Sequence, residues 1–143
     1  MPTLSAAMAA AGSALSAERV RLEASISNLA NAESTRGPDG QPYRRRDVVL
    51  ATDNVNSFDA ALGRASDALG VKVAAVVEDK SPFRVRYEPS HPDADAEGYV
   101  ALPNVDPAEE MVDMLSAARA YQANLTAVGM IRDLVQRALE LGR

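Results

Sequence analysis

Cysteine is absent from the chain, and histidine occurs once, as His91. Without cysteine, the 143-residue sequence can hold no disulfide framework, thiolate metal site or thiol nucleophile. A catalytic triad is not expected at His91, because Ser90 directly precedes it and a serine adjacent to its base in sequence rarely points toward it. The length excludes a large multi-domain enzyme. We therefore predict no catalytic residue, no cofactor and no small-molecule substrate.

A net positive charge and a long apolar run are also missing. The formal net charge is -5. Nucleic acid and anionic membranes bind positive surfaces, so neither is expected as the main partner. No run of about 20 apolar residues, the length that spans a bilayer, is present.

Charge is absent from the first 17 residues, since Glu18 is the first charged side chain. This Ala/Ser-rich stretch favours a helix that is marginal by itself and packs densely against other chains, because small side chains let backbones approach closely. No Lys or Arg precedes its apolar residues, and the helical pattern continues past any plausible cleavage point. A cleaved secretory signal is therefore not expected.

Apolar residues follow alternating three- and four-residue steps at both ends of the chain, which is a heptad pattern. The N-terminal seam consists of Leu4, Met8, Ala11, Leu15, Leu22 and Leu29. The C-terminal seam consists of Met111, Met114, Ala118, Tyr121, Leu125, Val128, Val135 and Leu139. Both segments are predicted to be long helices with helical partners. The pattern leaves open whether the two helices pair only with each other or also with other chains.

The second helix has a recognisable start. Asp106 can cap it, Pro107 suits the first helical position, and Glu109 lies where a capping box would be closed. We therefore predict three parts: an N-terminal helix over 1–33, a β-rich middle domain over 34–106 and a C-terminal helix over 107–143.

Alternation of apolar and polar residues predicts half-buried strands in the middle part. The clearest are "VKVAAVV" from Val71 and "FRVRYE" from Phe83, with "RDVVLA" from Arg46 and "GYVAL" from Gly98 as companions. Together they indicate one small sheet and an α+β fold. The segment from residue 54 to residue 70 has no clear pattern.

Two charged runs are candidate binding sites. The run "DADAEG" from Asp93 imitates the start of a calcium-binding EF-hand loop, but Asn104 stands where a bidentate Glu is needed and Pro92 forbids a normal entering helix. A solvated acidic turn is favoured over weak calcium binding. Arg44, Arg45 and Arg46 lack a phosphate loop or an interleaved aromatic platform, so salt bridges or a solvated strand edge are the default.

Four segments carry a family resemblance. "SNLANAEST" from Ser27 resembles the motif shared near the N-termini of the bacterial flagellar axial proteins, which form the rod and hook. "DGQPYRRRDVV" from Asp39, the run "SPFRVRYEPSHPDADAEGYVALPNVDPAEEMVDML" from Ser81 and "SAARAYQANLTAV" from Ser116 occur in the order and at the spacing typical of proximal rod proteins. The resemblance covers most of the chain, apart from the Ala-rich first helix and residues 54–77.

The resemblance implies a structural subunit of the periplasm-spanning rod, with the terminal helices forming an inner layer in a coiled-coil-like arrangement. It implies export without cleavage through the flagellar type III apparatus. The implied partners are the rod protein FlgB, the distal rod proteins and the adaptor FliE, in a hetero-oligomeric helical assembly. The seam residues are expected at subunit interfaces. We also hypothesise that Asn28 and Asn31 bond backbone groups of the helix end or of a neighbouring subunit, and that the three arginines form intersubunit ion pairs. A generic coiled-coil adaptor is the competing interpretation.

Overall fold

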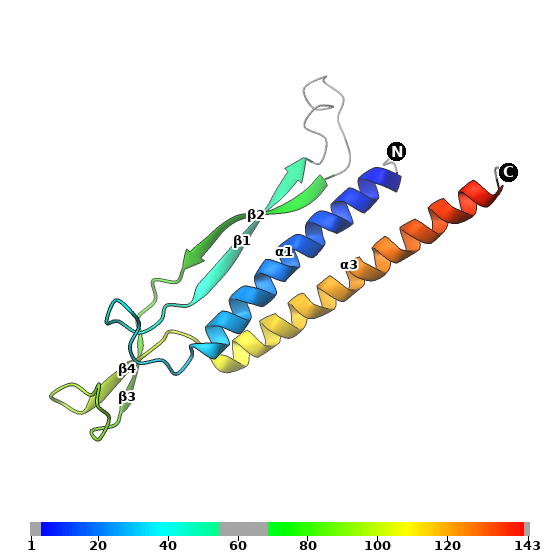
Figure 1. The fold of residues 1–143 in the computed structure, drawn as a ribbon. Helices are drawn as coiled ribbons and strands as arrows, with labels where there is room; N and C mark the ends of the chain where they lie inside the picture. Colours follow the sequence, from blue (N-terminus) through cyan, green and yellow to red (C-terminus); the bar gives the residue numbers. More distant parts are fainter. Residues whose placement is uncertain (1–3, 55–68, 142–143) are drawn as a thin grey trace. The chain divides into compact units, whose positions relative to one another are not determined.

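The computed structural model describes residues 4–54 and 69–141, which form two long helices and four strands (Figure 1). In chain order the elements are α1 (Leu4–Ala30), β1 (Arg46–Asn54), β2 (Leu69–Glu78), β3 (Arg84–Tyr87), β4 (Tyr99–Leu102) and α3 (Pro107–Leu141). The predicted α+β class is confirmed. Most of the segment without a clear sequence pattern lies outside the described residues.

Helix α1 runs for 27 residues and ends at Ala30. At its end the N–H of Asn31 bonds both the Ser27 and the Asn28 carbonyls, and the Ser34 hydroxyl donates to the Asn31 carbonyl at 2.9 Å. These bonds satisfy backbone groups that a helix terminus leaves free. The small polar residues at the end of α1 therefore cap the helix, and the chain then continues toward β1.

Helix α3 runs for 35 residues and begins at Pro107, as predicted. Asp106 is the cap: its carboxylate accepts the Ala108 N–H at 2.8 Å. Glu109 is exposed, and among the described residues it makes no bond back to Asp106, so the predicted capping box is not formed. The acid that faces inward is Glu110, which is 1% exposed.

The prediction of one small sheet is wrong, because the described strands form two two-stranded sheets, β1–β2 and β3–β4. In Figure 1, β1 and β2 run in opposite directions. Strands β3 and β4 are antiparallel, with Arg84 opposite Leu102 and Tyr87 opposite Tyr99. Among the described residues each sheet is therefore a two-stranded ribbon.

The prediction that β3 is half-buried is also wrong. All its residues are exposed, whereas β4 alternates, with Val100 and Leu102 buried. The apolar residues of β3 that sequence alternation assigned to the core, Val85 and Tyr87, instead lie on the outer face of the ribbon.

The chain divides into two compact units. Unit 1 comprises Met1–Val20, Val49–Ala75 and Ser116–Arg143, and unit 2 comprises Arg21–Val48 and Val76–Leu115. The buried apolar residues of unit 1, among those described, are the alanines Ala6, Ala17 and Ala117. Unit 2 buries Val100, Leu102 and Val105 together with Ala32 and the polar residues Ser25, Asn28 and Glu110. Small side chains thus make the core of one unit, and polar side chains make part of the core of the other.

Candidate functional site

Asn28, in the last turns of α1, is 1% exposed and is paired with the backbone of Arg46. Its amide donates to the Arg46 carbonyl at 3.0 Å and accepts the Arg46 N–H at 2.9 Å. This pair of bonds imitates the pairing between two peptide groups in a strand ladder. The Tyr43 hydroxyl also donates to the Asn28 oxygen, at 3.0 Å. Asn28 therefore joins the end of α1 to the start of β1.

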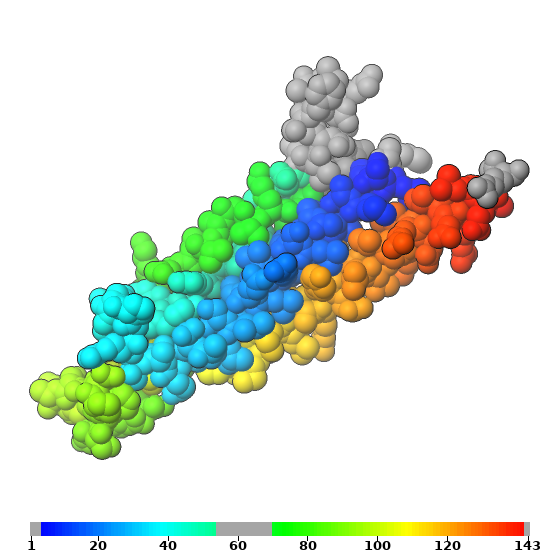
Figure 2. Space-filling model, in the orientation of Figure 1, coloured from blue at the N-terminus to red at the C-terminus, as the bar shows by residue number. Residues whose placement is uncertain are grey.

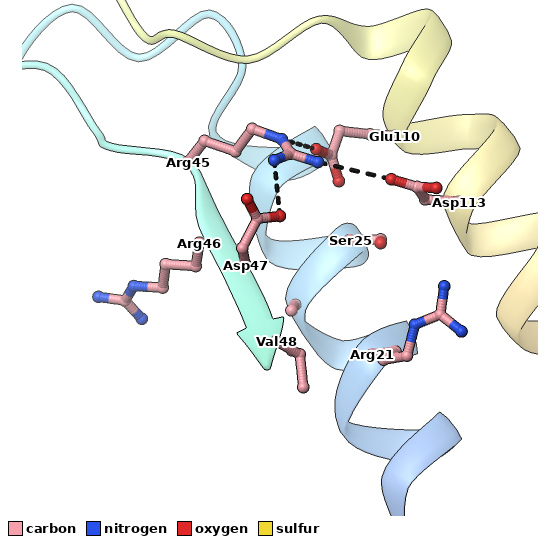
Figure 3. A pocket seen from close by; sticks show the side chains of 9 residues that line it. Arg21, Ser25, Arg45, Arg46, Asp47, Val48, Glu110 and Asp113 are labelled. Atoms are coloured by element: carbon pink, nitrogen blue, oxygen red, sulfur yellow. Dashed lines mark hydrogen bonds and ion pairs between the residues drawn. The ribbon is translucent and has the colours of Figure 1, made fainter. Parts of the chain in front are cut away.

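Arg45, the residue before β1, is joined to the first turns of α3 (Figure 3). Its Nε lies 2.5 Å from Oε1 of Glu110, and its Nη1 lies 2.6 Å from the carboxylate of Asp47. Its Nη2 lies 3.5 Å from Asp113. The second oxygen of Glu110 accepts the Asn28 amide at 3.1 Å. Asn28, Arg45 and Glu110, which we call the polar cluster, thus tie together α1, the chain entering β1, and α3.

Burial and charge act against each other at Arg45. Burial disfavours the charged guanidinium, but the hydrogen bond and charge of Glu110, followed by the charges of Asp47 and Asp113, raise the pKa of Arg45 above its ordinary value. Among the described residues, no buried side-chain nitrogen or oxygen lacks a hydrogen-bond partner. A fully partnered buried ion pair is costly to break, because removing one member leaves an uncompensated charge.

The backbone of Arg45 is held as firmly as its side chain. Its N–H donates to Oδ1 of Asn104 at 2.9 Å, and its carbonyl accepts the Asp79 N–H at 2.8 Å. The Asn104 amide continues to the Ser81 hydroxyl at 2.8 Å. The Ser81 backbone N–H, followed by its side chain, lowers the pKa of Asp79 by bonding that carboxylate. These bonds fix the position from which the Arg45 side chain reaches Glu110.

A cavity of about 140 Å³ lies beside the polar cluster (Figure 3). Its lining combines basic and acidic side chains in equal number, with a serine and two apolar residues: Arg21, Ala24, Ser25, Arg45, Arg46, Asp47, Val48, Glu110 and Asp113. The cavity is smaller than the roughly 300–1,000 Å³ typical of ligand pockets, and its charged lining can hold water. This volume and the balanced charge suit a structural junction better than a substrate site.

Within residues 4–54 and 69–141, only the middle arginine of the predicted set forms an ion pair through its guanidinium, and its partners lie within the chain. Arg44 stacks over the Phe83 ring with 4.3 Å to the centroid. Arg46 lies over the Tyr43 ring at 5.6 Å and is exposed. Figure 3 shows its guanidinium pointing away from the polar cluster. The default prediction of salt bridges is thus confirmed for Arg45, and intersubunit ion pairs stay a prediction for Arg44 and Arg46.

Asn31 bonds a backbone group at the end of its own helix, which was one of the two partners that the hypothesis offered. Its amide donates to the Ser27 carbonyl at 2.8 Å. Asn28 differs, because it bonds the backbone of Arg46 and the side chain of Glu110. Its side chain is occupied within the chain.

The acidic run forms a hydrogen-bonded turn. Asp93 accepts the Thr35 hydroxyl at 2.8 Å and pairs with Arg36 at 3.1 Å. Asp95 accepts the N–H groups of Glu97 and Tyr99. The carboxylates of Asp93 and Asp95 therefore bond different groups and do not converge on one point. In residues 4–54 and 69–141, no group of three or more His, Asp or Glu side chains is placed to hold a metal ion.

Comparison with known proteins agrees with the resemblance of the sequence segments. Residues 96–141, which include β4 and all of α3, match the family described as flagellar basal body rod FlgEFG protein C-terminal. The flagellar basal-body rod protein FlgC of Salmonella typhimurium is 49% identical over 133 residues, covering 93% of each chain. The FlgC of Bacillus subtilis is 45% identical over 92% of this chain and 93% of its own. The FlgC of Borreliella burgdorferi is 39% identical over 92% of each.

The chain belongs to the FlgC family of flagellar basal-body rod proteins. The chain is accordingly a structural subunit of the flagellar basal-body rod. No helix of the described residues is long and apolar enough to cross a membrane.

In this FlgC-family chain, none of the predicted seam residues is buried. Those that are exposed are Leu4, Met8, Met111, Ala118, Leu125, Val135 and Leu139. Those that are half-buried are Ala11, Leu15, Leu22, Leu29, Met114, Tyr121 and Val128. The buried helix positions are different residues, such as Ala17 and Ala117. The seams therefore do not form the core of the single chain.

Glu110 and Asn104 are functional residues of this FlgC-family chain that were not predicted from the sequence. Glu110, Met114, Ala117 and Tyr121 follow one another at four-, three- and four-residue steps, on the inward face of α3. That spacing could have predicted from the sequence that Glu110 faces inward. Asn104 follows Pro103 in an irregular segment, where no periodic pattern indicates which way a side chain points.

Proposed function

We propose that this rod subunit lies in the proximal rod and that its terminal segments, 1–33 and 107–143, form an inner layer with the helices of neighbouring subunits. Residues 34–106 would form the outer part. The observation that carries the proposal is the exposure of apolar seam residues on both helices. Leu4 is 47% exposed, Leu125 47% and Leu139 70%. Fully burying one such side chain contributes about 1.5–3 kcal/mol, so an assembly that covers the seams is favoured over the free chain.

The neighbouring subunits are proposed to be FlgB, the distal rod proteins and the adaptor FliE, with further copies of this chain. Two seams on one chain support this, because a surface that is not complementary to itself makes head-to-tail contacts, and such contacts generate helical assemblies. Arg44 and Arg46 would add ion pairs to these contacts. Partly exposed pairs contribute about 0–1 kcal/mol each, so the arginines would direct subunit orientation more than they would strengthen assembly.

The polar cluster is proposed to carry torque within one subunit. A drive shaft transmits rotation only if the elements of each subunit keep their mutual angle under load. Asn28 and Arg45 join α1, the start of β1 and the start of α3 through bonds of 2.5 to 3.1 Å. Buried and fully partnered hydrogen bonds resist displacement, because any displacement leaves a polar group unpaired.

Export through the flagellar type III apparatus, without a cleaved signal, is proposed as the route to the rod. The uncharged stretch before Glu18 suits this route, because a segment that is marginally helical alone can pass a narrow channel extended and order on assembly. We propose no catalytic activity.

Electron microscopy of detergent-extracted basal bodies from a strain lacking this gene tests the proposal, beside the same strain complemented. Rings without a completed rod, restored by complementation, are the expected result. Normal flagella in the deletion strain would contradict a rod function and favour the generic coiled-coil adaptor. Locating the chain in the cell also distinguishes the two interpretations, because an adaptor would form stable oligomers in the cytoplasm and a rod subunit would be found in the basal body.

A further inference from the structure

The loop that joins β3 to β4, residues 88–98, is folded by hydrogen bonds between its own groups. The Glu88 N–H donates to the Gly98 carbonyl at 2.9 Å, and the His91 N–H donates to the Glu88 carbonyl at 3.0 Å. The His91 carbonyl in turn accepts the Ala94 N–H at 3.0 Å. In Figure 2 this loop, coloured yellow-green, lies at the surface of the molecule, so its side chains can exchange protons with water.

His91, the single histidine of the chain, accepts a hydrogen bond inside this loop. Its ring nitrogen Nδ1 accepts the backbone N–H of Asp93 at 3.1 Å. An imidazole nitrogen accepts a hydrogen bond only while it carries no proton, so this bond requires a neutral ring with its proton on Nε2. A protonated ring would direct an N–H of its own toward the Asp93 N–H, and the bond would be lost.

Asp93, which this bond holds in place, connects the loop to the segment that follows α1. Its Oδ2 accepts the Thr35 hydroxyl at 2.8 Å, and its Oδ1 lies 3.1 Å from Nη2 of Arg36. We call these two contacts the Asp93 tether. The Asp93 side chain is 22% exposed, so its carboxylate is largely withdrawn from water and depends on these partners.

The charged groups around His91 come from the loop, from β3 and from the segment after α1. Glu88 offers its carbonyl to the His91 N–H, and its carboxylate pairs with Nε of Arg86 at 2.9 Å. Arg36 is paired with Asp93. Because the His91 ring bonds Asp93 directly, a positive charge on the ring acts on the Asp93 carboxylate in competition with the partners in the tether.

We propose that His91 is a proton-dependent latch on the Asp93 tether. With the ring neutral, Nδ1 holds the Asp93 backbone where its carboxylate reaches Thr35 and Arg36. When a proton passes from water to Nδ1, the bond to the Asp93 N–H is lost and the imidazolium attracts the Asp93 carboxylate. Both changes draw Asp93 away from the segment after α1, so the loop is fixed to that segment at neutral pH and released in mild acid.

The change is local to the loop. The β3–β4 ribbon stays packed through Val100 and Leu102, each of which is 1% exposed. An ion pair between Arg86 and Glu33 at 3.0 Å also joins β3 to the segment after α1, but these side chains are 46% and 61% exposed, so water screens the pair. The inference concerns contacts within one chain and does not depend on the proposed place of the subunit in the rod.

The pH range of the latch separates it from the other charged groups. Imidazoles change charge between about pH 5 and pH 8, where ordinary carboxylates and guanidinium groups keep theirs. His91→Asn is the matched variant, because an asparagine oxygen accepts the N–H two residues later in an Asx turn and does not titrate. His91→Ala has no acceptor, so it leaves the Asp93 N–H without this bond at every pH.

Hydrogen exchange of the Asp93 amide, measured by NMR as protection relative to an unstructured peptide, tests the bond. Between about pH 7.5 and about pH 5.5 the unsubstituted chain is expected to lose protection by about two- to tenfold, the equivalent of one hydrogen bond. His91→Asn is expected to keep its protection at both pH values, and His91→Ala is expected to show the low protection at both. The Asp79 N–H, which bonds the Arg45 carbonyl at 2.8 Å, is the internal control and should not change.

The ring and the tether are observed in the same NMR samples. The ring ¹⁵N shifts report which nitrogen carries the proton, and the Thr35 methyl and Arg36 Nε–H signals are expected to shift together with the ring in the unsubstituted chain and to stay in place in His91→Asn. A proton on Nδ1 at about pH 7.5 would overturn the proposal. So would equal Asp93 protection at both pH values in the unsubstituted chain, an acid-induced loss of the same size in His91→Asn, or an equal loss at Asp79.

Discussion

The Nε of Arg45 lies 2.5 Å from a carboxylate oxygen of Glu110, and the Glu110 side chain is 1% exposed. These residues are 65 positions apart in the chain and join the approach to β1 with the first turn of α3. Further hydrogen bonds extend the pair: Asn28 donates to Glu110, and Arg45 donates to Asp47 and Asp113. Its energetics can be measured directly.

Glu110→Ala is expected to lower the free energy of unfolding by about 1–3 kcal/mol, because the half-buried guanidinium of Arg45 loses one of its partners and the buried Asn28 amide loses an acceptor. Chemical denaturation of the purified variant measures this. Asp113→Asn is the matched control: Asp113 is 48% exposed and 3.5 Å from Arg45, so its loss is expected to cost less than about 1 kcal/mol. The double variant Arg45→Met/Glu110→Met is expected to regain most of the loss. A double variant that is less stable than Glu110→Ala alone would contradict this account of the pair.

Asn28→Ala is expected to cost about 1–3 kcal/mol, since it leaves the N–H and carbonyl of Arg46 without their partner. Asn31→Ala is expected to be milder, because its amide makes one bond, to the Ser27 carbonyl at the helix end. Thermal unfolding of both variants compares them. In cells, the double variant Asn28→Ala/Asn31→Ala is expected to impair rod assembly while export continues. Normal swimming by the double variant would remove this role.

Gly98→Ala is expected to destabilise the β3–β4 ribbon by more than about 1 kcal/mol, because φ is +87° and the new Cβ would meet the Tyr87 ring and Pro89. Gly40→Ala is the control, since Gly40 has a φ of +80° with nothing within 4 Å of the added Cβ. The difference between the two variants, measured by denaturation, isolates the steric part. Equal costs would show that the Tyr87 ring moves aside freely.

Acid is expected to weaken the chain partly through Asp79. Hydrogen bonds from Ser81 lower its pKa below 3.8 in the folded state, so the folded chain gains stability from the charged carboxylate above that pH. This gain is lost as the pH falls through the lowered pKa. Asp79→Asn should therefore show a smaller loss of unfolding free energy between pH 7 and about pH 3. An identical loss in both chains would exclude a contribution from Asp79.

The sequence predicted much of the architecture, because the signals for it are local. Heptad spacing predicted both helices, Asp106 and Pro107 marked the start of α3, and alternation, with companion segments, located the four described strands. Strand pairing was wrong because apolar alternation does not specify the neighbour of a strand or which face is covered: Val85 and Tyr87 alternate like core residues yet lie outside. The polar cluster could not be assembled from the sequence, since Asn28 and Glu110 are 82 positions apart and no local pattern pairs them.

The uncovered helix seams are the central feature of the proposed rod contact. The most direct test is a strain whose only copy carries Leu125→Asp and Leu139→Asp, beside a control with Gln122→Asp, an exposed polar position on the same helix. Electron microscopy of extracted basal bodies is combined with measurement of the exported chain. The account predicts normal export of both chains, with complete rods in the control and rings without completed rods in the seam variant. Complete rods in the seam variant would contradict the claim that exposed helix seams hold this subunit in the rod.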